Sequence, residues 1–173
     1  MGYLVRKADA FLREWKQNPD RNPLIIKGAR QVGKTETIRT FARENYKNVV
    51  EINFITEPAY KSIIDEGFST DHIIKLISRI DPTKHFVENE TLIFFDEIQD
   101  FPEIATALKF FKENAKYDVI CSGSLLGVQY QRIASISVGY KTDYQMYSMD
   151  FEEFLWAKGY SEEMVLDMLG HML

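Results

Sequence analysis

The segment from Gly28 to Thr35, with the sequence GARQVGKT, constrains the fold more strongly than any other part of the chain. It matches the pattern G-x-x-x-x-G-K-[ST], between a short apolar run at 24–26 and a segment whose apolar residues recur at helical spacing. Glycines allow backbone N–H groups to turn inward around phosphate oxygens, and the following helix directs its positive dipole end at the same anion. The segment therefore predicts a strand, a phosphate-binding loop and a helix. The alternative is a glycine-containing turn with an exposed lysine.

Two side chains of this segment carry chemistry of their own. Lys34 supplies a mobile positive charge for the β- and γ-phosphates, and the Thr35 hydroxyl is placed to ligate Mg²⁺, which prefers oxygen ligands. Arg30 and Gln31 lie inside the loop, so their side chains can equally form a salt bridge or face a partner while the backbone binds. We expect nucleotide contacts from consecutive residues: Gly28, Ala29, Arg30, Gln31, Val32, Gly33, Lys34, Thr35 and Glu36.

Two acidic residues, Asp96 and Glu97, follow directly after the apolar run 91–95. Alone, this pattern is equally typical of a buried strand that runs out into solvent. Beside a phosphate-binding loop it predicts a second part of the same site, in which Asp96 holds Mg²⁺ through water. Glu97, one residue further along, is then placed to polarise the attacking water as a general base. The predicted catalytic residues are Lys34, Glu97 and Ser124.

Ser122 and Ser124 follow a fourth expected strand, 117–121. If that strand lies beside the third, one of these hydroxyls can sense the γ-phosphate or position water; otherwise the serines start a turn or cap a helix. Arg132 and Lys141 are candidate cations for the γ-phosphate of a neighbouring molecule, with a solvated surface role as the alternative for each.

The order of elements predicts an α/β fold. Strands expected at 24–26, 49–55, 91–95, 117–121 and 144–147 alternate with helical patterns, which indicates a parallel sheet with right-handed crossovers. A lead-in helix is expected at 3–16, and further helices at 58–66, 71–80, after Pro102, at 151–157 and after Ser161. We expect one domain over 1–173. Because the last apolar pattern continues to the final residue, we expect this domain to be the N-terminal part of a longer protein.

Composition limits the environment and the partners. The 21 Lys and Arg against 26 Asp and Glu give a net charge of −5, so charge does not indicate nucleic acid as a partner, although a local basic patch can still exist. A single cysteine, Cys121, cannot form an intramolecular disulfide, which fits a reducing cytoplasm. The longest apolar runs are a few residues long, so we expect neither membrane insertion nor secretion.

The motifs together resemble the AAA+-type P-loop ATPases, and within them a prokaryotic family with a G-x-R-Q-V-G-K-T loop. The matching segments are Gly28–Thr35, Phe94–Gln99, Ser122–Gly127 and Met149–Trp156. The resemblance implies a three-layer sandwich around a mainly parallel five-stranded sheet with strand order 5-1-4-3-2, and ATP as the ligand. It also implies a C-terminal region that often contains a winged-helix-like lid and a nuclease-like domain. Many relatives have an arginine where this chain has Tyr140 and Lys141 after Gly139.

The expected function is Mg²⁺-dependent ATP binding and hydrolysis, coupled to a conformational change in a C-terminal effector region. One alternative is a nucleotide-binding switch or interaction module with negligible turnover. A second is a small-molecule kinase, which the Asp96-Glu97 pair disfavours because that glutamate suits water activation. Self-association follows if an arginine is supplied to the site by a neighbouring copy.

Overall fold

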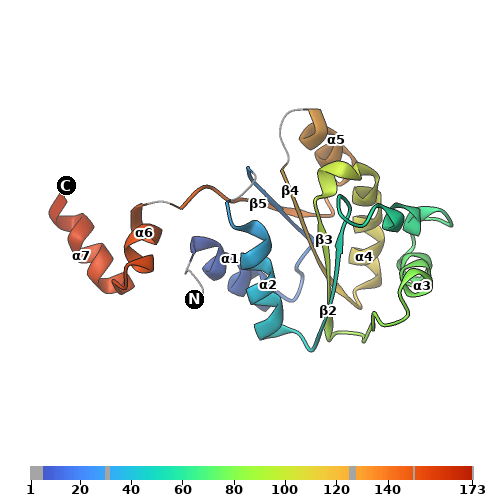
Figure 1. Cartoon of the computed structure of the whole chain (residues 1–173), viewed down its shortest axis with the longest axis horizontal. Coiled ribbons are helices and arrows are strands. Elements are labelled where there is room, and N and C mark those ends of the chain that lie inside the picture. Colours follow the sequence, from blue (N-terminus) through green and yellow to red (C-terminus); the bar gives the residue numbers. More distant parts are fainter. Residues whose placement is uncertain (1–5, 30–31, 125–127, 150, 173) are drawn as a thin grey trace.

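A five-stranded sheet forms the centre of the computed structural model, which describes residues 6–29, 32–124, 128–149 and 151–172 (Figure 1). The strand order is β2-β3-β4-β1-β5, and each neighbouring pair is parallel. The strands are β1 (Leu24–Lys27), β2 (Asn48–Asn53), β3 (Thr91–Asp96), β4 (Asp118–Gly123) and β5 (Thr142–Gln145). The expected α/β sandwich and the order 5-1-4-3-2 are confirmed.

Helices cover both faces of the sheet and bury two separate cores. On one face lie α1 (Lys7–Gln17) and α2 (Lys34–Asn45), and on the other lie α3 (Thr70–Ile80) and α4 (Leu108–Asn114) (Figure 1). Successive residues of β3 alternate between the cores: Phe94 packs with the α1 and α2 layer, and Phe95 packs with the α3 and α4 layer. All six residues of β3 are buried, which explains the uninterrupted apolar run of this strand.

Several elements differ from their predicted bounds. The lead-in helix begins at Lys7, because Arg6 is extended and acts as its N-cap, and residues 3–5 lie outside the described residues. The segment after Pro58 is a 3₁₀ helix, η1 (Pro58–Ile64), and Pro102 begins another, η3 (Pro102–Ala107), which leads into α4. The fifth strand lies two residues earlier than the expected 144–147, at the sheet edge, where every residue of it is only half-buried. Helix α5 (Val128–Ile136) was not predicted.

Two helices follow the sheet, α6 (Phe151–Ala157) and α7 (Glu162–Met172). They lie beyond the N-terminal end of α1 and away from the sheet (Figure 1). The predicted bounds of α6 are confirmed, and so is the cap of α7, where the Ser161 hydroxyl accepts the Met164 N–H at 3.2 Å. The Asp150 cap predicted for α6 falls outside the described residues. Within the described ranges, no helix combines the length and apolar character needed to cross a membrane.

Candidate functional site

The predicted chemical groups meet where the central strands end. Ligands of open α/β sheets bind outside the carboxyl ends of the strands. Gly28 follows the last residue of β1, Asp96 is the last residue of β3, and Ser122 lies near the end of β4. Strand β4 lies between the other two, and its Ser122 is in register with Ile26 of β1. The adjacency of the third and fourth strands, on which the serine prediction depended, is therefore confirmed.

The loop after β1 closes onto the first residue of α2. Gly33 precedes the helix with φ of 95°, a left-handed conformation that glycine adopts without steric cost. The Lys34 ammonium donates to the carbonyl oxygens of Gly28 at 2.9 Å and of Ala29 at 2.7 Å. The first N–H groups of a helix have no intrahelical partner. This helix terminus therefore presents a cation together with backbone donors that have no intrahelical partner, which suits an anion.

Asp96 joins three parts of this site. Its Oδ2 accepts the Thr35 hydroxyl of α2 at 3.1 Å. Its Oδ1 accepts the Glu97 N–H at 2.9 Å, and also the hydroxyl of Ser122 from β4. The side chain is only 3% exposed. The predicted metal-ligating pair, Thr35 and Asp96, thus lies in direct contact, although the two residues are far apart in the sequence.

Burial shifts the titration of both central charged groups. Burial raises the pKa of the Asp96 carboxyl, and the charge of Glu97 raises it further, against the hydrogen bonds from Ser122 and Thr35. Burial lowers the pKa of the Lys34 ammonium, while the negative charges of Glu97 and Asp96 oppose this change. A cation bound beside Asp96 would favour its ionised form. Both shifts favour the uncharged forms, so opposite charge bound at the site would stabilise the ionised forms of Asp96 and Lys34.

Glu97 adopts a backbone conformation that is rare for this residue type. Its φ is 59° and its ψ is 48°, in the left-handed region. Such conformations cost of order 1–3 kcal/mol and persist where the surroundings fix them. Here the Asp96 carboxylate accepts the Glu97 N–H, and the Asp100 N–H donates to the Glu97 carbonyl at 3.1 Å. The left-handed turn at Glu97 directly precedes the short 3₁₀ segment Ile98–Asp100.

A buried arginine ties the phosphate-binding loop to the C-terminal helices. Arg6, 8% exposed, donates through Nη1 to the Val32 carbonyl at 2.7 Å and through Nη2 to the Tyr147 carbonyl at 2.8 Å. Its Nε pairs with Glu153 of α6 at 2.9 Å. Glu153, 5% exposed, also accepts the Lys7 N–H at the start of α1. One ion pair therefore connects the loop, the segment after β5, α1 and α6.

Comparisons with known proteins agree with this geometry. A family model described as AAA domain matches residues 20–155, which is more than half of the chain. The chain belongs to the AAA domain family. Membership of this family supports nucleotide binding and hydrolysis in general. A search of the curated proteins finds no match.

Solved structures also match the chain at low sequence identity. One is PCH-2 of C. elegans, with 10% identity and a TM-score of 0.49, matched over 82% of this chain and 42% of that one. Another is a chain of Drosophila ORC bound to DNA, with 11% identity and a TM-score of 0.48, matched over 81% of this chain and 89% of that one. The AAA domain thus spans less than half of the PCH-2 chain.

The described residues of the predicted nucleotide-contacting segment take different positions in the structure. Gly28 packs against the segment after β5 so tightly that a Cβ there would overlap the Met146 carbonyl oxygen. Val32 is buried, and its carbonyl oxygen accepts from Arg6. Glu36 is exposed in the first turn of α2, and its carboxylate lies 3.7 Å from Arg43, on the outer surface of the helix. The predictions for Arg30 and Gln31 fall outside the described residues.

The remaining candidates take different positions. Ser122 is fully buried and donates to Asp96, so its hydroxyl supports the acid. Ser124 directly follows β4, and its buried hydroxyl has no hydrogen-bond partner within the described part of the chain. Arg132 pairs with Glu103 at 2.7 Å, and its side chain stays 55% exposed. Lys141 pairs with Asp143 two residues along β5.

Two residues near the site had no predicted role. Arg6 precedes an amphipathic helix, and nothing in its local sequence distinguishes it from a solvated arginine. Gln99 follows the acidic pair, and the resemblance includes it in a motif without assigning a function. Its side chain contacts Glu97 and the backbone of Ser124. The signal for Gln99 was its spacing of two residues from Glu97, which lets one short turn bring the side chains together.

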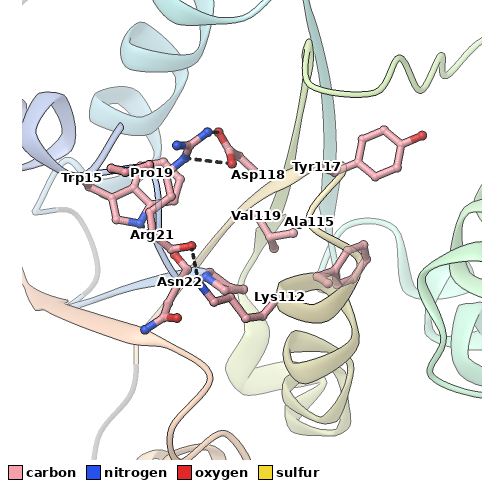
Figure 2. Close-up of a pocket in the computed structure, with 11 residues that line it drawn as sticks. Trp15, Pro19, Arg21, Asn22, Lys112, Ala115, Tyr117, Asp118 and Val119 are labelled. Atoms are coloured by element: carbon pink, nitrogen blue, oxygen red, sulfur yellow. Dashed lines mark hydrogen bonds and ion pairs between the residues drawn. The ribbon is translucent and has the colours of Figure 1, made fainter. Parts of the chain in front are cut away.

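A hollow lies at the opposite edge of the sheet from the candidate site (Figure 2). Trp15 forms one wall, and the guanidinium of Arg21 forms two hydrogen bonds of 2.9 Å to the carboxylate of Asp118, at the start of β4. The Lys112 ammonium donates to the Asp20 carbonyl at 2.7 Å. These charged groups are satisfied by one another and by the backbone. The contacts around the hollow therefore hold the loop before β1 against β4 and α4. They add no candidate site.

Proposed function

We propose that this AAA domain binds ATP with Mg²⁺ and hydrolyses it at the carboxyl edge of the sheet. The observation that carries the proposal is the hydrogen bond of 3.1 Å between Thr35 and Asp96. It joins the first turn of the helix after the phosphate-binding loop to the acid at the end of β3. A hydroxyl after the phosphate-binding loop and a carboxylate at the end of a neighbouring strand are the two groups that hold Mg²⁺ in P-loop sites for phosphoryl transfer.

The donor atoms of Thr35 and Asp96 fit a magnesium ion. Mg²⁺ takes oxygen ligands and is usually held by one or two carboxylates together with substrate phosphates. A hydroxyl and a carboxylate lie together here, and Ser122 orients the carboxylate by donating to its other oxygen. When bound, the ion neutralises negative charge on the phosphates.

Residues of the chain bind the phosphates, activate the attacking water and position the loop. The backbone N–H groups at the start of α2 and the Lys34 ammonium bind the phosphates, so Lys34 exchanges its contacts with the Gly28 and Ala29 carbonyls for phosphate oxygens. The Glu97 carboxylate accepts a proton from the attacking water. Arg6 holds the Val32 carbonyl, and with it the loop, against α6.

The same contacts support coupling to a C-terminal effector region. A change in the conformation of the loop on nucleotide binding or hydrolysis moves the Val32 carbonyl, and Arg6 transmits that movement to Glu153 on α6.

We place the domain in the cytoplasm, where Cys121 stays reduced. We also propose that the chain associates with a second copy of itself. The exposed Arg132 guanidinium of one copy would then reach the γ-phosphate of the nucleotide bound by the other.

Steady-state phosphate release tests the proposal. Wild type should release phosphate from ATP with Mg²⁺, and both Lys34→Ala and removal of Mg²⁺ by a chelator should abolish release, because each removes a charge that stabilises the transferred group. The control is Lys47→Ala. Lys47 directly precedes β2, at the other end of the strands from the site, and its side chain is 75% exposed, so this variant should keep wild-type rates.

The alternatives give different results in the same assay. Tight ATP binding with no phosphate release would identify a nucleotide-binding switch, and transfer of the phosphoryl group to a small molecule would identify a kinase. Equal rates in wild type and Lys34→Ala would contradict the assignment of the site.

A further inference from the structure

One glutamine connects the two strand ends that frame the site. The Nε2 of Gln99 donates to Oε2 of Glu97, and its Oε1 accepts the Ser124 N–H at 3.1 Å. Glu97 directly follows β3, and Ser124 directly follows β4. The side chain of Gln99 thus spans the gap between the predicted general base and the end of the neighbouring strand.

The chemistry of the two partners fixes the orientation of this amide. A carboxylate can only accept, so the NH₂ group must face Glu97, and a backbone N–H can only donate, so the amide oxygen must face Ser124. Reversing the amide would break both contacts. The bond to the carboxylate is charge-assisted and stronger than a bond between neutral groups.

The backbone around Gln99 restricts its movement. Gln99 lies in a short 3₁₀ helix, η2 (Ile98–Asp100), that begins immediately after the left-handed Glu97. Ile98 is fully buried in the core that includes Phe95, so it anchors this turn to the sheet. The amide of Gln99 is therefore held in place by the backbone turn. A change of the Glu97 rotamer would break its charge-assisted hydrogen bond to this amide.

We propose that Gln99 is a positioning residue that holds the Glu97 carboxylate in its reactive orientation and links it to the end of β4. The inference rests on the proposed function, since it assigns Glu97 as the base. Because Gln99 acts through Glu97 and contacts none of the phosphate-binding groups described above, its loss slows the chemical step and leaves nucleotide affinity almost unchanged.

Two substitutions separate the contacts of Gln99. Gln99→Met has a similar length and removes both hydrogen bonds. Gln99→Glu keeps an oxygen for the Ser124 N–H but replaces the donor to Glu97 by a negative charge. Both should lower kcat by about 10- to 100-fold, the range for a displaced reacting group, while the Kd for Mg-ATP stays within about threefold of wild type. The matched control is Gln17→Met, at the exposed end of α1, which should keep wild-type kcat.

A double variant tests the path of the effect. In a Glu97→Gln background, Gln99→Met should cause no further loss of kcat, because its effect passes through the carboxylate that is already absent. Unfolding by urea without nucleotide checks that the fold is intact. If Gln99→Met and Gln99→Glu fold and keep wild-type kcat, or if the losses in the double variant multiply, the inference is wrong. A wild type that does not hydrolyse ATP would instead overturn the proposed function.

Discussion

Replacing Glu97 by glutamine is expected to lower kcat for ATP hydrolysis by about 10²- to 10⁴-fold, the usual contribution of a general base. The glutamine has nearly the same shape but cannot accept the proton of the attacking water. Thr35, Asp96 and Lys34 are unchanged, so the Kd for Mg-ATP should stay close to that of wild type. Single-turnover hydrolysis and equilibrium binding, measured on the same preparation, separate the two effects.

Glu113→Gln provides the control for this substitution. Glu113 is exposed near the end of α4, next to Lys112 at the opposite edge of the sheet, so removal of its charge should change neither kcat nor Kd. A Glu97→Gln variant with wild-type turnover would show that another group activates the water. A variant that loses ATP binding as well would show that Glu97 serves the binding of the nucleotide.

The second large effect concerns the ion pair between Arg6 and Glu153. Glu153→Ala should lower the free energy of unfolding by about 3–5 kcal/mol, because it leaves the buried Arg6 guanidinium without its counter-charge. It also removes the acceptor for the Lys7 N–H at the start of α1. Urea unfolding followed by circular dichroism measures the change.

Two further variants make this prediction specific. Glu152→Ala removes the neighbouring acid, whose carboxylate lies 3.7 Å from Lys7 in a pair that is partly exposed to solvent on both sides, so we expect a loss of only about 0–1 kcal/mol. Arg6→Met combined with Glu153→Leu replaces the pair by apolar side chains and should recover part of the stability lost in Glu153→Ala, since the carbonyls of Val32 and Tyr147 still lose the Arg6 donors. A loss in Glu153→Ala no greater than that in Glu152→Ala would contradict the role of the buried pair.

Local patterns predicted the parts of the site that lie on consecutive residues. The spacing of glycine, lysine and threonine in Gly28–Thr35 reports a strand-to-helix turn, and α2 indeed begins at Lys34. The acid at the end of the apolar run 91–95 was predicted to share the site, because parallel strands bring their carboxyl ends to one edge. Its contact with Thr35 agrees with that reasoning. The strand order itself came from the resemblance.

Other features of the structure had no such signal. Arg6 and Glu153 are separated by 147 positions, and neither residue type nor spacing indicates that they pair. The predicted position of β5 differed from the observed one, Thr142–Gln145, by two residues. The reason is that an edge strand of half-buried residues lacks a strong apolar pattern. Helix α5 was missed for a similar reason: only a part of its surface faces the core, through residues such as Ile133.

Thermal unfolding with and without Mg-ATP tests the central claim most directly. ATP at about 100 times its Kd adds about 2.7 kcal/mol to the stability of the folded state. For a domain of this size, that corresponds to a rise in Tm of about 5–10 °C. We predict this rise for wild type with Mg²⁺ and no rise for Lys34→Ala. A wild-type Tm that is unchanged by saturating Mg-ATP would contradict nucleotide binding at Gly28–Thr35.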